Sequence, residues 1–155
     1  MSEPVALVGR GFCYEDLRVG FRFRTHRRTI TEADLAGFVN LSWLTEELFA
    51  VQEGEMSDAG RAIKGRAVPA ALVYAFAEGL LLPTMQDTGL AFLNATLDVK
   101  GPTLVGDTIH VEGEVTEMRL TSKGDRGLVR FANRVINQRG ESVLAYNPLR
   151  LLKRK

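Results

Sequence analysis

Residues 68–82 have the sequence VPAALVYAFAEGLLL, which is apolar around the whole circumference of a helix apart from Tyr74 and Glu78. Pro69 fits the first turn, where a missing N–H leaves no helical bond unmade, and Pro83 is expected to end the helix. A helix that is apolar on all sides has to be buried over most of its surface. In a chain of 155 residues, a sheet wrapped around the helix is the natural way to bury it.

The sequence after this helix is typical of antiparallel strands. Ile109, Val111 and Val115 alternate with polar residues, which predicts a strand with one buried face. A turn is expected at residues 138–140, where Gly140 suits a positive φ. We predict four strands in this half of the chain, at residues 91–99, 107–120, 128–137 and 142–152.

The sequence before the helix predicts one strand and two short helices. Residues 21–29 alternate with the period of a strand, and residues 31–34 form a capping box that opens a helix through Phe38. A second short helix is expected near residues 45–51, followed by a charged loop with several glycines at residues 52–66. The predicted class is α+β, with residues 1–155 in a single domain and residues 1–11 as a loose N-terminal arm.

The composition argues against several classes of partner. A net charge of +1 and a pI near 7.9 create no overall field for nucleic acid or an anionic membrane, so neither partner is expected. The longest apolar run, residues 67–77, is shorter than the roughly 20 residues that a membrane span needs. The N-terminus lacks the pattern of a secretory signal, and the single cysteine, Cys13, fits a reducing compartment. A cytoplasmic location is therefore expected.

Several segments, in this order and spacing, resemble the MaoC-like dehydratase and (R)-specific enoyl-CoA hydratase family. Residues 99–108, VKGPTLVGDT, are similar to its strand–Pro–x–x–x–Gly–Asp–Thr segment, and residues 135–143, VINQRGESV, are similar to its Asn-Gln-x-Gly-Glu-x-Val segment. Residues 16–20 and 29–34 resemble the start of its first strand and helix. The resemblance implies the hotdog fold, in which a curved antiparallel sheet wraps around one long buried helix.

The resemblance also implies a chemistry whose catalytic pair is missing from this sequence. Family members hydrate a trans-2-enoyl thioester, or run the reverse dehydration, with an Asp and a His in an Asp-x-Asn-Pro-x-His motif that activate the water. Here residues 41–49 read LSWLTEELF. Aligned without gaps, Leu44 occupies the Asp position and Phe49 the His position. With a gap, Ser42 occupies the Asp position and the His is deleted. No catalytic residue is therefore assigned.

A second family motif, Ile-Ala-His-Gly before the central helix, corresponds to residues 67–70 here, so Ala70 stands in place of the glycine. The resemblance implies that the N–H of Ala70 or Ala71, at the helix N-terminus, can still donate to a thioester carbonyl. Arg61, Lys64 and Arg66 precede this helix and are candidates for the phosphates of coenzyme A or an acyl carrier. The alternative for these three residues is a solvated surface.

The remaining charged and titratable residues have simpler interpretations. A carboxylate near the expected mouth could act as a base, but a solvated charged face is the preferred interpretation for these residues: Glu46, Glu47, Glu53 and Glu55. His26 and His110 are each expected on a polar, solvent-exposed strand face. A basic exposed face is also expected for Arg22, Arg24, Arg27 and Arg28. The sequence shows no cluster of metal ligands, and no cofactor is expected beyond acyl-CoA as substrate or ligand.

These observations favour a protein of the MaoC-like dehydratase and hydratase type that binds an acyl thioester, acyl-CoA or acyl carrier, and is degenerate in catalysis. One alternative is a non-catalytic subunit that pairs with an active hotdog paralogue, as some heteromeric dehydratases of this family do. The apolar replacements Leu44 and Phe49 favour that alternative, because an abandoned polar site tends to be filled with apolar side chains. An acyl-CoA thioesterase with a glutamate base is a third reading. A homodimer, or a dimer with a paralogue, is expected because the sheet has an open edge.

Overall fold

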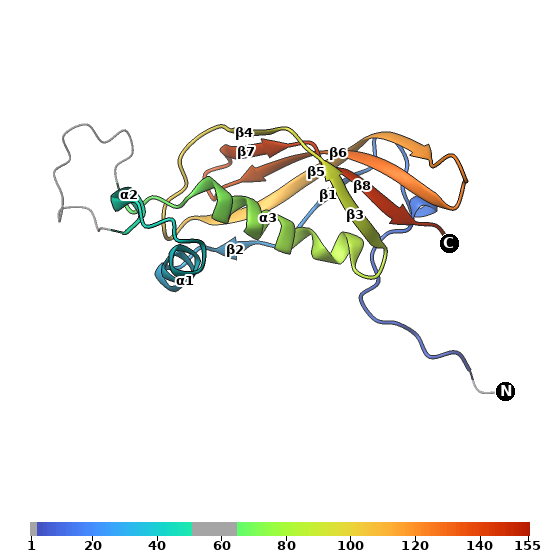
Figure 1. The fold of residues 1–155 in the computed structure, drawn as a ribbon, viewed down its shortest axis with the longest axis horizontal. Helices are drawn as coiled ribbons and strands as arrows, with labels where there is room; N and C mark the ends of the chain where they lie inside the picture. Colours follow the sequence, from blue (N-terminus) through green and yellow to red (C-terminus); the bar gives the residue numbers. More distant parts are fainter. Residues whose placement is uncertain (1–2, 51–64) are drawn as a thin grey trace.

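The structure of the chain is a computed structural model that describes residues 3–50 and 65–155 (Figure 1). One long helix combined with an antiparallel sheet confirms the predicted α+β class. In chain order, the elements are η1 (Tyr14–Asp16), β1 (Arg22–Arg24), β2 (Arg28–Thr29), α1 (Glu32–Ser42), α2 (Glu47–Ala50), α3 (Ala70–Met85), β3 (Gly89–Asn94), β4 (Leu97–Val99), β5 (Thr108–Leu120), β6 (Arg126–Ile136), β7 (Ser142–Tyr146) and β8 (Leu149–Lys153).

The long helix α3 lies along one face of the sheet, as Figure 1 shows, and this face is called the inner face below. Leu72, Val73, Ala77 and Leu81 of α3 are all buried. They belong to a core with apolar side chains from β5, β6 and β7, which include Ile109, Val111, Val135 and Leu144. This packing confirms the fold expected from the resemblance. One side of α3 is nevertheless open in the single chain, since Ala71, Ala75, Gly79 and Leu82 are exposed.

The bounds of α3 differ from the expectation at its end. Pro69 is the N-cap and the helix begins at Ala70, but it continues through Pro83 to Met85. The expectation that Pro83 ends the helix is therefore wrong. A proline in the last turn costs one hydrogen bond, to the carbonyl four residues earlier, which belongs to the exposed Gly79. The Thr84 hydroxyl donates to the Leu81 carbonyl at 2.6 Å and helps to satisfy the end of the helix.

The sheet has eight antiparallel strands with the long β5–β6 hairpin at its centre. Its main order is β1-β5-β6-β7-β4, while β2 also pairs with β5 and β8 pairs with both β3 and β6. Two of the expected strands are each broken in two, at residues 95–96 and 147–148. The breaks are joined to each other, because the Asn147 side-chain oxygen accepts hydrogen bonds from both the backbone N–H and the hydroxyl of Thr96, each at 2.7 Å.

The N-terminal part carries the short elements that the sequence predicts. Thr31 and Asp34 form the expected capping box, with the Asp34 N–H donating to the Thr31 hydroxyl at 3.2 Å and the Thr31 N–H donating to Asp34 at 2.9 Å. Helix α1 runs past the expected Phe38 to Ser42 and ends at Trp43 in the left-handed conformation, with φ of 63°. The expected strand at residues 21–29 is divided into β1 and β2. Residues 3–10 are exposed. None of the helices in the described ranges has the length and apolar character of a membrane span.

Candidate functional site

A cavity of 280 Å³ lies at the N-terminus of α3 on the inner side of the sheet. Its walls are almost entirely apolar, with Phe49 from α2, Ala70 and Val73 from α3, and Val99 from β4. The other lining residues are Leu48, Val68, Gly101, Pro102, Thr103, Val143 and Leu144. The two segments that carry the family resemblance, residues 99–108 and 135–143, thus supply a large part of this wall. A narrow apolar hollow of this size suits a short hydrocarbon chain.

The N-terminus of α3 adds a polar group to this apolar cavity. The carbonyl of Pro69 accepts hydrogen bonds from the N–H groups of Leu72, at 3.0 Å, and Val73, at 3.2 Å. Within the described residues, no acceptor takes the N–H of Ala70 or of Ala71, as is usual for the first turn of a helix. Ala70 lines the cavity, whereas Ala71 is exposed and does not. Ala70 is therefore the residue of the two that can present a donor to a bound carbonyl oxygen.

The residues that the two alignments put in place of the missing catalytic pair differ in their position relative to the cavity. Phe49 lines the cavity, but Leu44 and Ser42 do not. The Ser42 hydroxyl donates to the Phe38 carbonyl at 2.6 Å and accepts from the Leu44 N–H at 3.3 Å. Ser42 is therefore engaged in ending α1, and its side chain is exposed.

The basic candidates for phosphate binding are not gathered at the cavity in the described part of the chain. Arg66 is half-buried and its guanidinium binds Glu32 at the start of α1, with its Nη2 2.7 Å and its Nε 2.9 Å from the same carboxylate oxygen. This pair ties the segment before α3 to α1. Lys64 and Arg61 lie outside the described residues, as do Glu53 and Glu55. Glu46 is exposed.

The two histidines lie away from the cavity beside Ala70. His26 is exposed, as expected. His110 was expected to face solvent, and this is wrong, because only 8% of the residue is exposed. Its Nε2 lies 3.3 Å from Oε1 of Glu112, on the sheet face opposite α3. The alternating sequence predicts the correct face of β5, but it does not show that neighbouring side chains cover that face.

A buried polar cluster beneath α3 was not found from the sequence. Glu78, one of the two residues that interrupt the apolar sequence of residues 68–82, accepts from Arg150 at 2.5 Å and from the Tyr146 hydroxyl at 3.3 Å. Burial, and then the Glu78 carboxylate, raise the pKa of Tyr146 well above its usual range. The ring of Tyr74 packs edge-on against that of Tyr146, with centroids 4.9 Å apart. The only sequence signal was a lone glutamate in an apolar helix, which needs a buried partner.

Among residues 3–50 and 65–155, no three or more histidine, cysteine, aspartate or glutamate side chains come together in a way that could hold a metal ion. The described lining of the cavity combines apolar side chains with one hydroxyl residue, Thr103, and with Ala70 at the start of α3.

Comparison with known proteins gives structural relatives only. No protein-family profile and no curated protein sequence matches the chain. The MaoC-like dehydratase of Rhodospirillum rubrum is similar, with 24% identity and a TM-score of 0.75 over 94% of this chain and 99% of that one. The R-hydratase of Pseudomonas aeruginosa has 26% identity and a TM-score of 0.73 over 94% and 88% of the two chains. The HadBC 3R-hydroxyacyl-ACP dehydratase complex of Mycobacterium tuberculosis has 17% identity and a TM-score of 0.68 over 86% and 96%.

These solved structures superpose on most of the length of this chain. The chain therefore has the hotdog fold of the MaoC-like dehydratases and R-hydratases, and the resemblance to that group is confirmed at the level of the fold.

Proposed function

We propose that this chain binds the acyl part of an acyl thioester, acyl-CoA or acyl carrier, in the cavity at the N-terminus of α3. The observation that carries the proposal is the apolar cavity of 280 Å³ lined by Ala70, the first residue of α3. The apolar walls hold the hydrocarbon, and the helix N-terminus suits the partly negative carbonyl oxygen of the thioester. The dehydratases and hydratases of the same fold support this choice of ligand.

Binding is proposed without efficient turnover. Hydration of an enoyl thioester needs a base that takes a proton from water, and histidine or a carboxylate is the usual base. In the described part of the chain, His26 and His110 both lie away from the residues that line the cavity. The residues that do line it there include no carboxylate, so they supply no strong base for water.

Calorimetric titration with crotonyl-CoA tests binding, and loss of the enoyl absorbance in the same solution tests hydration. We expect saturable binding, with hydration no faster than in buffer. The substitution Val99→Trp fills the mouth of the cavity from an exposed position and should weaken binding about tenfold or more, equivalent to about 1.4 kcal/mol. Val19→Trp is the matched control, because Val19 is 60% exposed and Val99 is 59% exposed, yet Val19 does not line the cavity.

Each possible result has a distinct meaning. Efficient hydration by the pure protein would refute the inactive interpretation while leaving the binding site in place. Absence of binding, or equal weakening in Val19→Trp and Val99→Trp, would refute the cavity as the site.

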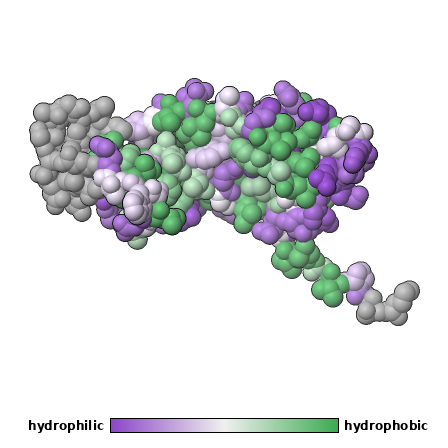
Figure 2. All heavy atoms as spheres, viewed as in Figure 1, coloured by the Kyte–Doolittle hydropathy of each residue, from purple (hydrophilic) through white to green (hydrophobic). Residues whose placement is uncertain are grey.

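A second candidate role is that of a subunit that pairs with another hotdog chain, either a copy of itself or a catalytic paralogue. The observation that favours it is an exposed apolar edge, which Figure 2 shows as green surface over the region of β3. Apolar residues of β3 and β4 that are exposed are Leu90, Phe92, Leu93, Leu97 and Val99. β3 pairs with β8 and β4 with β7, and an apolar strand that has a neighbour on one side only favours addition of a strand from a second chain.

Light scattering tests this second role. We expect a dimer of the pure chain, or a heterodimer when a hotdog paralogue is added. Leu93→Asp should shift the equilibrium to monomer, whereas Leu120→Asp should not, although Leu120 on β5 is similarly exposed, at 40% against 49%. A monomer at tens of micromolar that also ignores added paralogues would count against the role.

A further inference from the structure

A second hollow lies on the face of the sheet opposite α3, called the outer face. Register places the charged side chains of three strands there, since Arg22 is opposite Glu114, Arg24 is opposite Glu112, and Glu112 is opposite Arg134. The alternate residues Phe23, Val111 and Val135 point instead into the core. Side chains of a strand alternate between the two faces, so these arginines and glutamates share the outer face.

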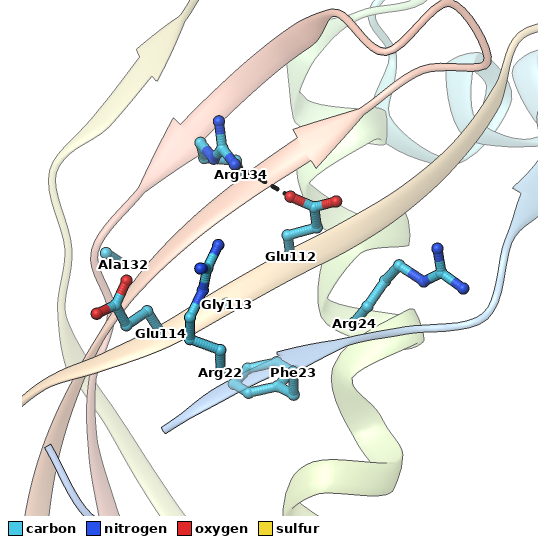
Figure 3. Close-up of a pocket in the computed structure, with 8 residues that line it drawn as sticks. All are labelled: Arg22, Phe23, Arg24, Glu112, Gly113, Glu114, Ala132 and Arg134. Carbon is cyan, nitrogen blue, oxygen red and sulfur yellow. Dashed lines mark hydrogen bonds and ion pairs between the residues drawn. The ribbon is translucent and has the colours of Figure 1, made fainter. Parts of the chain in front are cut away.

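Two adjoining cavities follow this charged row. One has a volume of 370 Å³ and the other 500 Å³, and both are lined by Arg24, Glu112 and Arg134. Together they form a groove, called the outer groove, whose further charged lining residues are Arg22 and Glu114 in the first cavity and Arg27 in the second. Figure 3 shows Arg22 extending across β5 between Glu112 and Glu114, while Arg24 extends in the other direction, away from the Glu112–Arg134 pair.

Glu112, one of the carboxylates of the groove, already has partners within the protein. The Glu112 carboxylate binds the buried His110 at 3.3 Å and Arg134 at 3.0 Å. The hydrogen bond from His110, followed by the attraction of Arg134 and Arg22, lowers the pKa of Glu112. Glu112 is thus held as the charged partner of His110 and Arg134 with Arg22 nearby, and within the described residues it forms no ion pair with Arg24 or Arg27.

The basic side is in excess. Within the described residues, Arg22, Arg24 and Arg27 have no carboxylate within ion-pair distance. Glu114 is the one other carboxylate that lines the groove, against four arginines in total. Guanidinium groups present planar pairs of N–H donors that match phosphate oxygens. Arg24 at the end of β1 and Arg27 in the segment between β1 and β2 line the same cavity, so one ligand there can reach both.

We propose that the outer groove binds a small anion that carries two linked phosphate groups, held by Arg24 and Arg27 with a contribution from Arg22. Two linked phosphates suit this arrangement better than a single phosphate does, because each of two neighbouring arginines can then contact a different phosphate. The groove lies on the opposite face of the sheet from the cavity beside Ala70. The proposal therefore does not rest on acyl thioester binding.

Calorimetric titration with inorganic pyrophosphate at low salt tests the proposal. We expect saturable binding of one pyrophosphate per chain, weakened at least about fivefold by Arg24→Gln and by Arg27→Gln. Arg119→Gln is the matched control, because Arg119 is exposed on β5, the strand that pairs with β1, but lies outside the groove, and it should leave binding unchanged. Added salt should weaken binding, since the contacts are partly exposed.

The plugged variant Val99→Trp separates this site from the acyl cavity, because it should bind pyrophosphate like the parent chain. No saturable binding of pyrophosphate would overturn the proposal and leave the arginines to an acidic protein surface or to solvent. Equal losses in Arg24→Gln and Arg119→Gln would overturn it as well, since the attraction would then be a general effect of charge. Circular dichroism of each variant shows whether a loss of binding reflects a loss of fold.

Discussion

The two faces of one sheet carry opposite kinds of environment. The inner face is apolar, with a cavity whose lining contains Val73, Val99 and Leu144. The outer face carries arginines and glutamates, together with the hydrogen-bonded histidine and carboxylate His110 and Glu112. The segments that carry the resemblance contribute to both faces, with Val99 and Val143 at the cavity and Thr108 and Gln138 at the outer groove.

Charged pairs on the two faces differ most in burial, and this difference gives the largest expected effect. Arg150 on the inner side binds Glu78 with 8% and 23% of the two side chains exposed, whereas Arg134 on the outer face binds Glu112 with 55% and 37% exposed. Arg150→Met should lower the free energy of unfolding by about 3 kcal/mol, because it leaves a largely buried carboxylate without its cation.

Arg134→Met is the matched control and should cost less than about 1 kcal/mol, because water screens an exposed pair. Urea denaturation of both variants gives the two values. Similar losses in both variants would mean that burial does not separate the faces. The double variant Glu78→Leu with Arg150→Met should recover much of the loss, since no unpaired charge remains.

Gly113 tests how closely the inner face is packed, and the expected effect is intermediate. A Cβ built on Gly113 would lie 2.2 Å from the tip of the Phe23 ring and 2.7 Å from Oδ1 of Asn133. Gly113→Ala should therefore destabilise the protein by about 1–3 kcal/mol through overpacking, measured by thermal or urea unfolding. Ala132→Ser on the outer face is a control of comparable size and should be close to neutral, since Ala132 is exposed. A neutral Gly113→Ala would show that Phe23 can move aside at little cost.

Much of the inner face could be predicted from the sequence. The composition of residues 68–82 predicts the buried helix, and Ala70 and Phe49, found through the resemblance, do line the cavity. The helix end was missed because Pro83 is tolerated where Gly79 is exposed. These are local properties, and local patterns are what a single sequence carries.

Contacts between distant residues could not be predicted in this way. Arg66 binds Glu32 across 34 positions, so a candidate for phosphate binding is held by a structural ion pair. The break at residues 95–96 is held by Asn147, which lies between β7 and β8 and is 51 positions from Thr96 in the sequence. Burial of His110 depends on side chains from other strands as well as on its own alternation. Each of these depends on tertiary packing that periodicity does not encode.

The two faces should also respond at opposite ends of the pH scale, with the smallest effects expected here. Glu112 on the outer face has a lowered pKa, so its contribution to stability is present above the usual carboxyl range and is lost as the pH falls below about 4. Tyr146 on the inner face has a raised pKa, so its contribution is present at neutral pH and is lost as the pH rises above about 10. Urea unfolding at a series of pH values measures the loss of unfolding free energy at both ends of the scale, here called the acid limb and the alkaline limb.

Glu112→Gln should flatten the acid limb by less than about 1 kcal/mol, because the pair is partly exposed, and should leave the alkaline limb unchanged. Tyr146→Phe should flatten the alkaline limb and leave the acid limb unchanged. If either variant altered both limbs, the two faces would be coupled through the sheet, and their separation into an apolar cavity and a charged groove would need to be abandoned.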